Sequence, residues 1–139
     1  MSGVLRISEA VSLGLHAMVL LTRYPNQRMS NIEVSETLHA SAHTLSKVFQ
    51  RLSRAGLVDA VRGVKGGFRL GRAPETITLL EIFEAIDGPL RINTCLLSRP
   101  ICTGKKCIFG GLAQSIQHEM RSYLSATRLA DVVDVIEPP

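Results

Sequence analysis

The pattern of hydrophobic and polar positions at residues 8–23 predicts a largely buried helix. Apolar side chains occupy nearly every side of a helix in this stretch, and no proline occurs before Pro25. One polar stripe remains, formed by Glu9, Ser12 and His16 at helical spacing. This stripe supplies candidate ligands within an otherwise apolar helix.

Two short helices with capping signals are predicted next. Residues 30–33 read Ser-Asn-Ile-Glu, which is typical of a capping box and of a helix running to about His39. Ser41 then caps a second helix, residues 42–55, which ends before Gly56. The second helix has one narrow apolar stripe, and its other side carries His43, Ser46, Lys47, Gln50, Arg51 and Arg54. We expect the apolar stripe of this helix to pack in a core and its cationic side to face solvent.

A β-hairpin is predicted after this pair of helices. Residues 58–61 and 68–70 are short strand candidates, and the segment 62–67 that joins them ends in Gly66-Gly67. Two short helices, a tight turn and a basic hairpin, in that order, predict a winged helix-turn-helix near residues 30–72. The fold class is therefore mainly α with a small β-hairpin.

The remaining chain is expected to hold a helix, a loop and a long helix. Thr78 and Glu81 fit another capping box, opening a helix to Asp87. Residues 89–110 contain glycines, prolines and all three cysteines, which predicts a loop; residues 111–128 have helical apolar spacing. We therefore divide the chain into a winged helix-turn-helix domain at 1–88, a cysteine-bearing loop at 89–110, and a long helix with a tail at 111–139. The apolar stripe of that helix could fold back on its own core or meet a second copy of the chain. The tail from Ala130 is expected to be loosely held.

Positive charge is concentrated in one block of the sequence. Residues 41–72 contain seven basic side chains against Asp59 alone, a net charge of +6, whereas the whole chain carries +4. A cationic block is the electrostatic signature of nucleic-acid binding, although a solvated surface face is the ordinary alternative. Aromatic residues make up only 4%, which argues against a stacking platform for single strands.

Several other classes of protein are disfavoured. No apolar run approaches the roughly 20 residues that span a bilayer, and the N-terminus lacks a secretory pattern, so we expect a cytoplasmic protein without membrane contact. We expect no enzyme, because no catalytic triad, paired-carboxylate cleft or phosphate-binding glycine loop is evident. An electron-transfer or cluster-carrier protein would leave the winged-helix pattern unexplained.

Cys95, Cys102 and Cys107 lie close enough in sequence to converge on a metal. The glycines and prolines around them allow the backbone to wrap closely round a site, and Lys105 and Lys106 would favour the thiolate form. An odd number of cysteines argues against a purely disulfide role. Ordinary loop cysteines remain the alternative at this point.

The run from Thr44 to Pro89 closely resembles the IscR/NsrR/RsrR-type family of bacterial regulators, also called the Rrf-two family. The matching motifs are L-x-K-V-F-x-x-L, G-L-V-x-x-x-R-G-x-x-G-G-F-x-L and I-T-L-x-E-I-x-x-A-I-x-G, followed by three clustered cysteines. The resemblance implies a homodimer in which long C-terminal helices cross between subunits. It also implies an iron–sulfur cluster that senses redox state, cluster supply or nitric oxide.

A protein of this type would read a double-stranded operator with two-fold symmetry. The helix 42–55 would lie in the major groove, with the base-edge contacts made by its N-terminal side chains His43, Thr44, Ser46 and Lys47. Arg51 and Arg54 are expected on phosphates. The resemblance puts Arg62 in the minor groove, with Lys65 beside it.

The fourth ligand of a cluster is open, since iron–sulfur clusters usually take four and this chain offers three cysteines. Gly110 stands where some relatives have a histidine ligand. The resemblance implies a ligand from the first helix of the other subunit, at a position matched by His16. Ser12, aligned with a carboxylate of relatives, is a poor iron ligand, and Glu9 is a spare candidate.

The type of cluster is open as well. A mixed cysteine and histidine site favours 2Fe–2S; 4Fe–4S is nearly as plausible, and zinc is a third option. The main alternative to cluster sensing is a regulator of the same fold controlled by thiol oxidation or by a protein partner.

Overall fold

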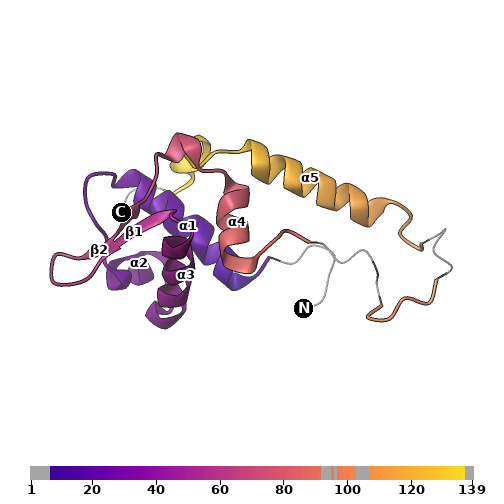
Figure 1. The fold of residues 1–139 in the computed structure, drawn as a ribbon, viewed down its shortest axis with the longest axis horizontal. Helices are drawn as coiled ribbons and strands as arrows, with labels where there is room; N and C mark the ends of the chain where they lie inside the picture. The colour runs from indigo at the N-terminus through magenta and orange to yellow at the C-terminus, as the bar shows by residue number, and fades with distance from the viewer. Residues whose placement is uncertain (1–6, 92–94, 96, 103–106, 137–139) are drawn as a thin grey trace.

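The computed structural model describes residues 7–91, 95, 97–102 and 107–136. The body of the molecule consists of helices α1 (Glu9–Arg23), α2 (Asn31–Leu38), α3 (Ala42–Arg54) and α4 (Leu79–Asp87) with the hairpin of β1 (Val58–Val61) and β2 (Gly67–Leu70). Helix α5 (Leu112–Ala126) extends away from it (Figure 1). The hairpin loop and the cysteine-bearing segment lie towards opposite ends of the view. The fold class predicted from the sequence, mainly helical with a small hairpin, is confirmed.

Helix α1, Glu9–Arg23, runs through the centre of the core, as its all-round apolar pattern predicts. Ser8 caps it by accepting a hydrogen bond from the amide of Val11 at 3.1 Å. The helix packs against α2, α3, α4, β2 and the C-terminal segment. A helix that is apolar on most sides is stable in water only if other elements cover it, and here they do so on several sides.

The helix-turn-helix consists of α2, Asn31–Leu38, and α3, Ala42–Arg54. Ser30 caps α2 through the Glu33 amide, and Ser41 caps α3 through the Thr44 amide, as predicted. The reciprocal bond of the first capping box is absent from the part of the chain that the structure describes. The turn between the helices places His39 in the left-handed region at φ 53°, a conformation that histidine adopts more readily than most residues.

The hairpin, which we call the wing, pairs β1, Val58–Val61, with β2, Gly67–Leu70, in antiparallel register. Met29 adds a bridge to β2: its amide and carbonyl both bond to Phe68, at 2.9 and 2.8 Å. Gly67 has φ +132°, and a Cβ atom there would lie 2.6 Å from the Met29 oxygen. This junction therefore requires glycine at position 67.

Helix α4, Leu79–Asp87, begins with the predicted capping box of Thr78 and Glu81. Helix α5, Leu112–Ala126, is slightly shorter than the predicted helix at 111–128. Between them, the described residues of the cysteine-bearing segment form bends and turns, as expected for a loop. Among the described residues, no helix is both long and apolar enough to cross a membrane.

The expectation of a loosely held tail is wrong as far as Ile136. A 3₁₀ helix, η2 (Leu129–Val135), packs against α1, and Leu129 is fully buried. Backbone bonds join this segment to the start of α4, from Leu79 N to Thr127 O at 3.0 Å and from Leu129 N to Ile77 O at 2.8 Å. The apolar run at residues 129–135 is too short to show a clear helical period, so the sequence does not indicate that it covers α1.

Replacing Gly67 by alanine is expected to destabilise the fold. The new Cβ would collide with the backbone of Met29, and the residue would keep a strained φ, so we expect a loss of about 1–3 kcal/mol in the free energy of unfolding, measured with urea. Gly111→Ala is the control, because nothing lies within 4 Å of its Cβ position. Equal stability of the two variants would contradict this description of the wing.

Candidate nucleic-acid interface

Helix α3 is divided into a buried flank and an exposed flank. Leu45, Val48, Phe49 and Leu52 are at most 2% exposed. His43, Ser46 and Lys47 are exposed at the opposite side, and Thr44 is half-buried near the N-terminus. The predicted division of the helix is confirmed, so the side chains proposed for base contacts face outward from the amino-terminal half of α3.

An aromatic stack joins α3 to the wing. The rings of Phe49 and Phe68 lie 3.9 Å apart, centre to centre, and nearly parallel at 6°. Phe49 is completely buried, so this contact belongs to the core as well as to the junction between the two elements. The Phe49–Phe68 contact therefore fixes the position of the wing relative to α3, which the strand pairing within the hairpin cannot do.

Two arginines and one carboxylate brace the base of the wing. Arg28, in the loop before α2, donates to the carboxylate of Asp59 at 2.7 Å and to the Asp59 carbonyl at 2.9 Å. Arg69, on β2, donates to the same carboxylate at 3.2 Å. The hydrogen bond from Arg28 is the main cause that lowers the pKa of Asp59 below 3.8. The sequence does not single out Arg28, because its partner Asp59 lies 31 residues further along the chain.

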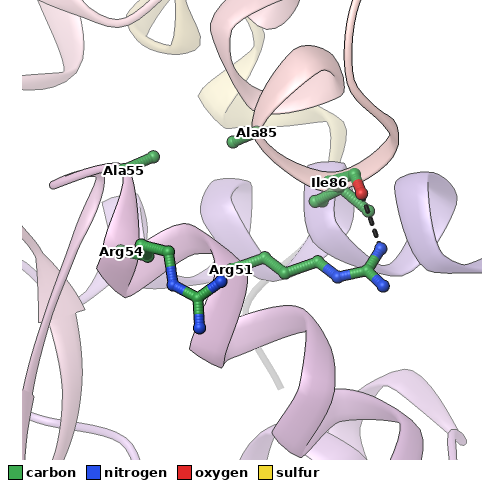
Figure 2. Close-up of a pocket in the computed structure, with 5 residues that line it drawn as sticks. All are labelled: Arg51, Arg54, Ala55, Ala85 and Ile86. Carbon is green, nitrogen blue, oxygen red and sulfur yellow. Dashed lines mark hydrogen bonds between the residues drawn. The ribbon is translucent and has the colours of Figure 1, made fainter.

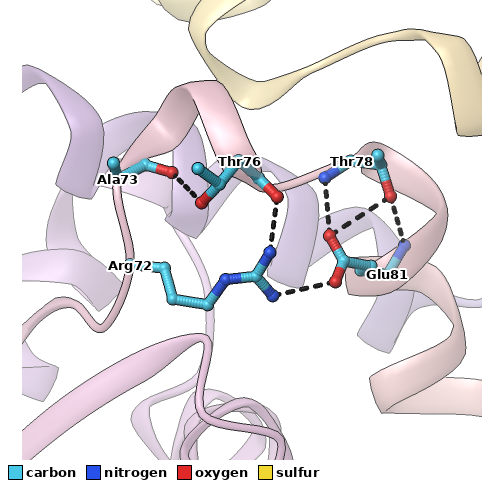
Figure 3. A network of polar contacts seen from close by, with 5 residues as sticks. All are labelled: Arg72, Ala73, Thr76, Thr78 and Glu81. Atoms are coloured by element: carbon cyan, nitrogen blue, oxygen red, sulfur yellow. Dashed lines mark hydrogen bonds and ion pairs between the residues drawn. The ribbon is translucent and has the colours of Figure 1, made fainter.

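Arg72 makes a second brace, between the end of the wing and α4 (Figure 3). Its guanidinium bonds to Glu81 at 2.8 Å and to the carbonyl of Thr76, while Glu81 also receives the Thr78 amide at 2.9 Å. Desolvation raises the pKa of Glu81, but the bonds from Arg72 and Thr78 outweigh it and lower the pKa overall. The guanidinium of Arg72 is thus engaged by groups of the protein itself.

The seven basic residues of the block at 41–72 therefore separate into two groups. Arg69 and Arg72 brace the fold, and Arg51 donates to the carbonyl of Ile86 at 2.6 Å (Figure 2). Within the described residues, four have side chains that make no hydrogen bond or ion pair: Lys47, Arg54, Arg62 and Lys65. All four are exposed on α3 or in the wing loop, where they can approach a polyanion.

The candidate metal ligands lie in two separate places. Cys102 and Cys107 are exposed and Cys95 is half-buried in the segment between α4 and α5, whereas His16 is exposed on α1. Among the described residues, no three histidine, cysteine, aspartate or glutamate side chains are grouped so that they could hold a metal ion. Within this described part of one chain, the three cysteines and His16 are thus not brought together, although thiolates and imidazole suit iron–sulfur clusters and zinc.

His16 has a defined orientation at the edge of an apolar hollow. Its Nδ1 lies 2.6 Å from the carbonyl oxygen of Ser12, which can only accept, so Nδ1 carries a proton and donates this bond. Leu15 and Val19 of α1, together with Leu79, Val132 and Val135, line the hollow. Glu9 is exposed and Ser12 half-buried on the same helix.

The protein-family comparison decides the identity of this fold. Residues 7–135 match the family model Rrf2, described as "Iron-dependent Transcriptional regulator". The chain belongs to the Rrf2 family. It is a DNA-binding transcriptional regulator, and the resemblance carried by its motifs is confirmed.

One curated relative and two solved structures that this chain resembles agree with this assignment. An HTH-type transcriptional regulator, ORF2, from Azotobacter vinelandii is 29% identical over 127 residues, covering 91% of this chain and 73% of that protein. The structure of CymR, the global cysteine regulator of B. subtilis, is 26% identical with a TM-score of 0.78, covering 96% and 99% of the two chains. T. potens IscR shares the fold at 22% identity and a TM-score of 0.71, covering 97% and 94%.

The brace at the base of this Rrf2 wing predicts a pH-dependent stability. The pKa of Asp59 is lower in the folded protein, so its ionised form stabilises the fold above 3.8, and this contribution is lost as pH falls through the folded value. Asp59→Asn should be less stable than the unsubstituted protein at neutral pH, and the difference in urea midpoint should shrink below pH 3.8.

The exposed Glu75 supplies the control, as Glu75→Gln should leave the midpoint unchanged throughout. A difference between Asp59→Asn and the unsubstituted protein that persists undiminished in acid would contradict the assigned role of the carboxylate.

Proposed function

We propose that this chain works as a homodimer that binds a two-fold symmetric duplex operator through α3 and the wing. His43, Thr44, Ser46 and Lys47 contact base edges in the major groove, Arg54 contacts phosphate, and Arg62 with Lys65 enters the adjacent minor groove. The observation that carries the proposal is the set of four exposed, unengaged cations on two elements that the Phe49–Phe68 stack joins. Charges held on a rigid frame fit a rigid polyanion better than charges on independent loops.

Exposed apolar side chains support the dimer. Leu112 and Tyr123 of α5 are more than half exposed, as are Ile101 and Ile108 in the segment before it. Helix α5 extends from the body in Figure 1, so much of its surface faces solvent in a single chain. A second subunit that crosses α5 would cover this surface and place two copies of α3 on one duplex.

We further propose that Cys95, Cys102 and Cys107 hold an iron–sulfur cluster together with His16 of the partner subunit. The donor set fits in chemistry, and the Nδ1 bond orients the ring of His16, as the hydrogen-bond partners of metal-bound histidines usually do. When bound, the cluster would supply a redox- or nitric-oxide-sensitive crosslink between subunits; 2Fe–2S is favoured over 4Fe–4S, and zinc is the least favoured. Glu9 and Ser12 are the other candidates for the fourth ligand.

A second candidate is a regulator of the same fold that responds through thiol oxidation or a protein partner, without a cluster. It is favoured by the exposure of Cys102 and Cys107 and by the similarity to CymR, which is named as a cysteine regulator. A structure of S. aureus CymR in an oxidized form has the same fold at a TM-score of 0.76.

Binding to DNA should be strongly salt-dependent and should require Lys47. For a duplex selected by the protein from random sequences, log K is expected to fall with log salt by about 0.9 for each phosphate contact. Lys47→Ala should weaken binding to that duplex by about 5- to 150-fold and relax the sequence preference, measured by fluorescence anisotropy. Arg99→Ala, which removes a charge outside α3 and the wing, is the control. Affinity that is indifferent to salt would refute the proposal.

Anaerobic purification distinguishes the cluster from its alternatives. We expect iron and acid-labile sulfide with a visible absorption spectrum, lost when all three cysteines are changed to alanine. His16→Ala should shift the spectrum, while the exposed His118 of α5 gives a matched control in His118→Ala. A colourless protein loaded with zinc, or one without metal, would exclude the cluster, and an unshifted spectrum would remove His16 from the site.

A further inference from the structure

Arg51 lies on the exposed side of α3, yet its guanidinium is bound by the fold. Its Nη1 donates to the carbonyl of Ile86 at 2.6 Å, and Ile86 is the last residue but one of α4. The last carbonyls of a helix have no partner within the helix and carry partial negative charge. Arg51 therefore caps α4 from α3, and Figure 2 shows it extended towards this carbonyl while the guanidinium of Arg54 points elsewhere.

The same end of α4 is in close contact with α1. A Cβ atom on Gly14 would lie 2.1 Å from the Cδ1 of Ile86 and 3.4 Å from a methyl group of Val48, so α1, α3 and α4 meet at this level. Ser8, the cap of α1, also donates to the carboxylate of Asp87 at 2.8 Å. A shift of this end of α4 therefore cannot occur without a response from α1 or α3.

The chain that leaves α4 is tied to this same point. The amide of Leu90 donates to Glu84 at 3.1 Å, Leu90 is buried, and Arg121 of α5 reaches its carbonyl at 3.5 Å. Leu90 lies at the start of the cysteine-bearing segment, residues 89–110, and Cys95 follows five residues on. One short stretch, residues 84–90, thus contacts α3, α1 and α5 and includes the start of the cysteine-bearing segment.

We propose that Arg51 is a positioning residue that couples the orientation of α3 to the place where the cysteine-bearing segment leaves α4, and that it is not a phosphate contact. The proposal rests on the DNA-binding function proposed above. Movement at residues 88–91 reaches α3 through the Ile86 carbonyl and the guanidinium of Arg51. Specific binding depends on the aim of a few side chains, whereas non-specific binding depends on charge. Loss of the hydrogen bond from Arg51 to the Ile86 carbonyl therefore weakens specific binding and leaves non-specific binding unchanged.

The first experiment compares Arg51→Met with Arg54→Met in the full-length protein. Both variants remove one positive charge from the same helix, and the probes are the selected duplex and a scrambled duplex of equal length. Arg51→Met is expected to lose about tenfold in affinity for the selected duplex only, with an unchanged salt slope. Arg54→Met should weaken binding to both duplexes and reduce the slope by about 0.9 for each phosphate that the variant no longer neutralises. An equal reduction of the slope by Arg51→Met would overturn the proposal.

The second experiment tests the route with a double-mutant cycle. Glu84→Ala releases the Leu90 amide at the start of the cysteine-bearing segment, and it should weaken binding to the selected duplex when Arg51 is present. In the Arg51→Met background it should have little further effect, because the link is already broken. Additive effects, or no effect of Glu84→Ala alone, would overturn the proposal.

A third measurement needs no DNA and separates the two proposals. In the free protein, Arg51→Met should speed hydrogen exchange at the amides of Gly88 and Leu90, and Arg54→Met should not. Unchanged exchange in both variants would overturn the coupling. If the unsubstituted protein bound no duplex while exchange changed as expected, the DNA-binding function would fail and the coupling would stand.

Discussion

The burial of one flank of α3 is the constraint on which the rest of the structure depends. Leu45, Val48, Phe49 and Leu52 hold this helix against the core, and that single contact fixes which side chains face outward. Phe49 extends the same constraint to the wing through its stack with Phe68. The hydrophobic effect has no preferred direction of its own. Because the apolar side chains of α3 form one narrow stripe, their burial fixes how the helix is rotated about its axis. The remaining flank is polar and cationic, and it is the surface that we propose to face DNA.

Arginines of equal charge have different roles in this molecule because of where the backbone places acceptors. Arg28, Arg69 and Arg72 each find a carboxylate within 3.2 Å and hold the wing in place. Arg51 finds a helix carbonyl. The cations left for a partner are fewer than the charge block suggests, but they stand on elements that these braces keep rigid. The elements that carry the cationic surface are thus held in place by contacts with the core and by these arginine bonds.

Much of the fold could be predicted from the sequence, because local signals were strong. Serine and threonine caps, the apolar stripe of α3 and Gly66-Gly67 each act within a few residues, and the structure places the elements close to the predicted bounds. The roles of Arg28 and Arg51 could not be predicted, since their acceptors lie 31 and 35 residues away in sequence. The packing of η2 on α1 was not predicted either, because its apolar run is too short to show a clear period. The meeting of His16 with the cysteines stays a prediction, because it involves a second subunit.

The central claim is that α3 and the wing touch one duplex together. A photo-cross-linking amino acid placed in turn at positions 47, 62 and 119 of the full-length chain, mixed with labelled selected duplex, tests this directly. Positions 47 and 62 should both give protein–DNA adducts, and position 119, exposed on α5, should give none. An adduct from only one of positions 47 and 62, or from neither, would contradict this joint contact.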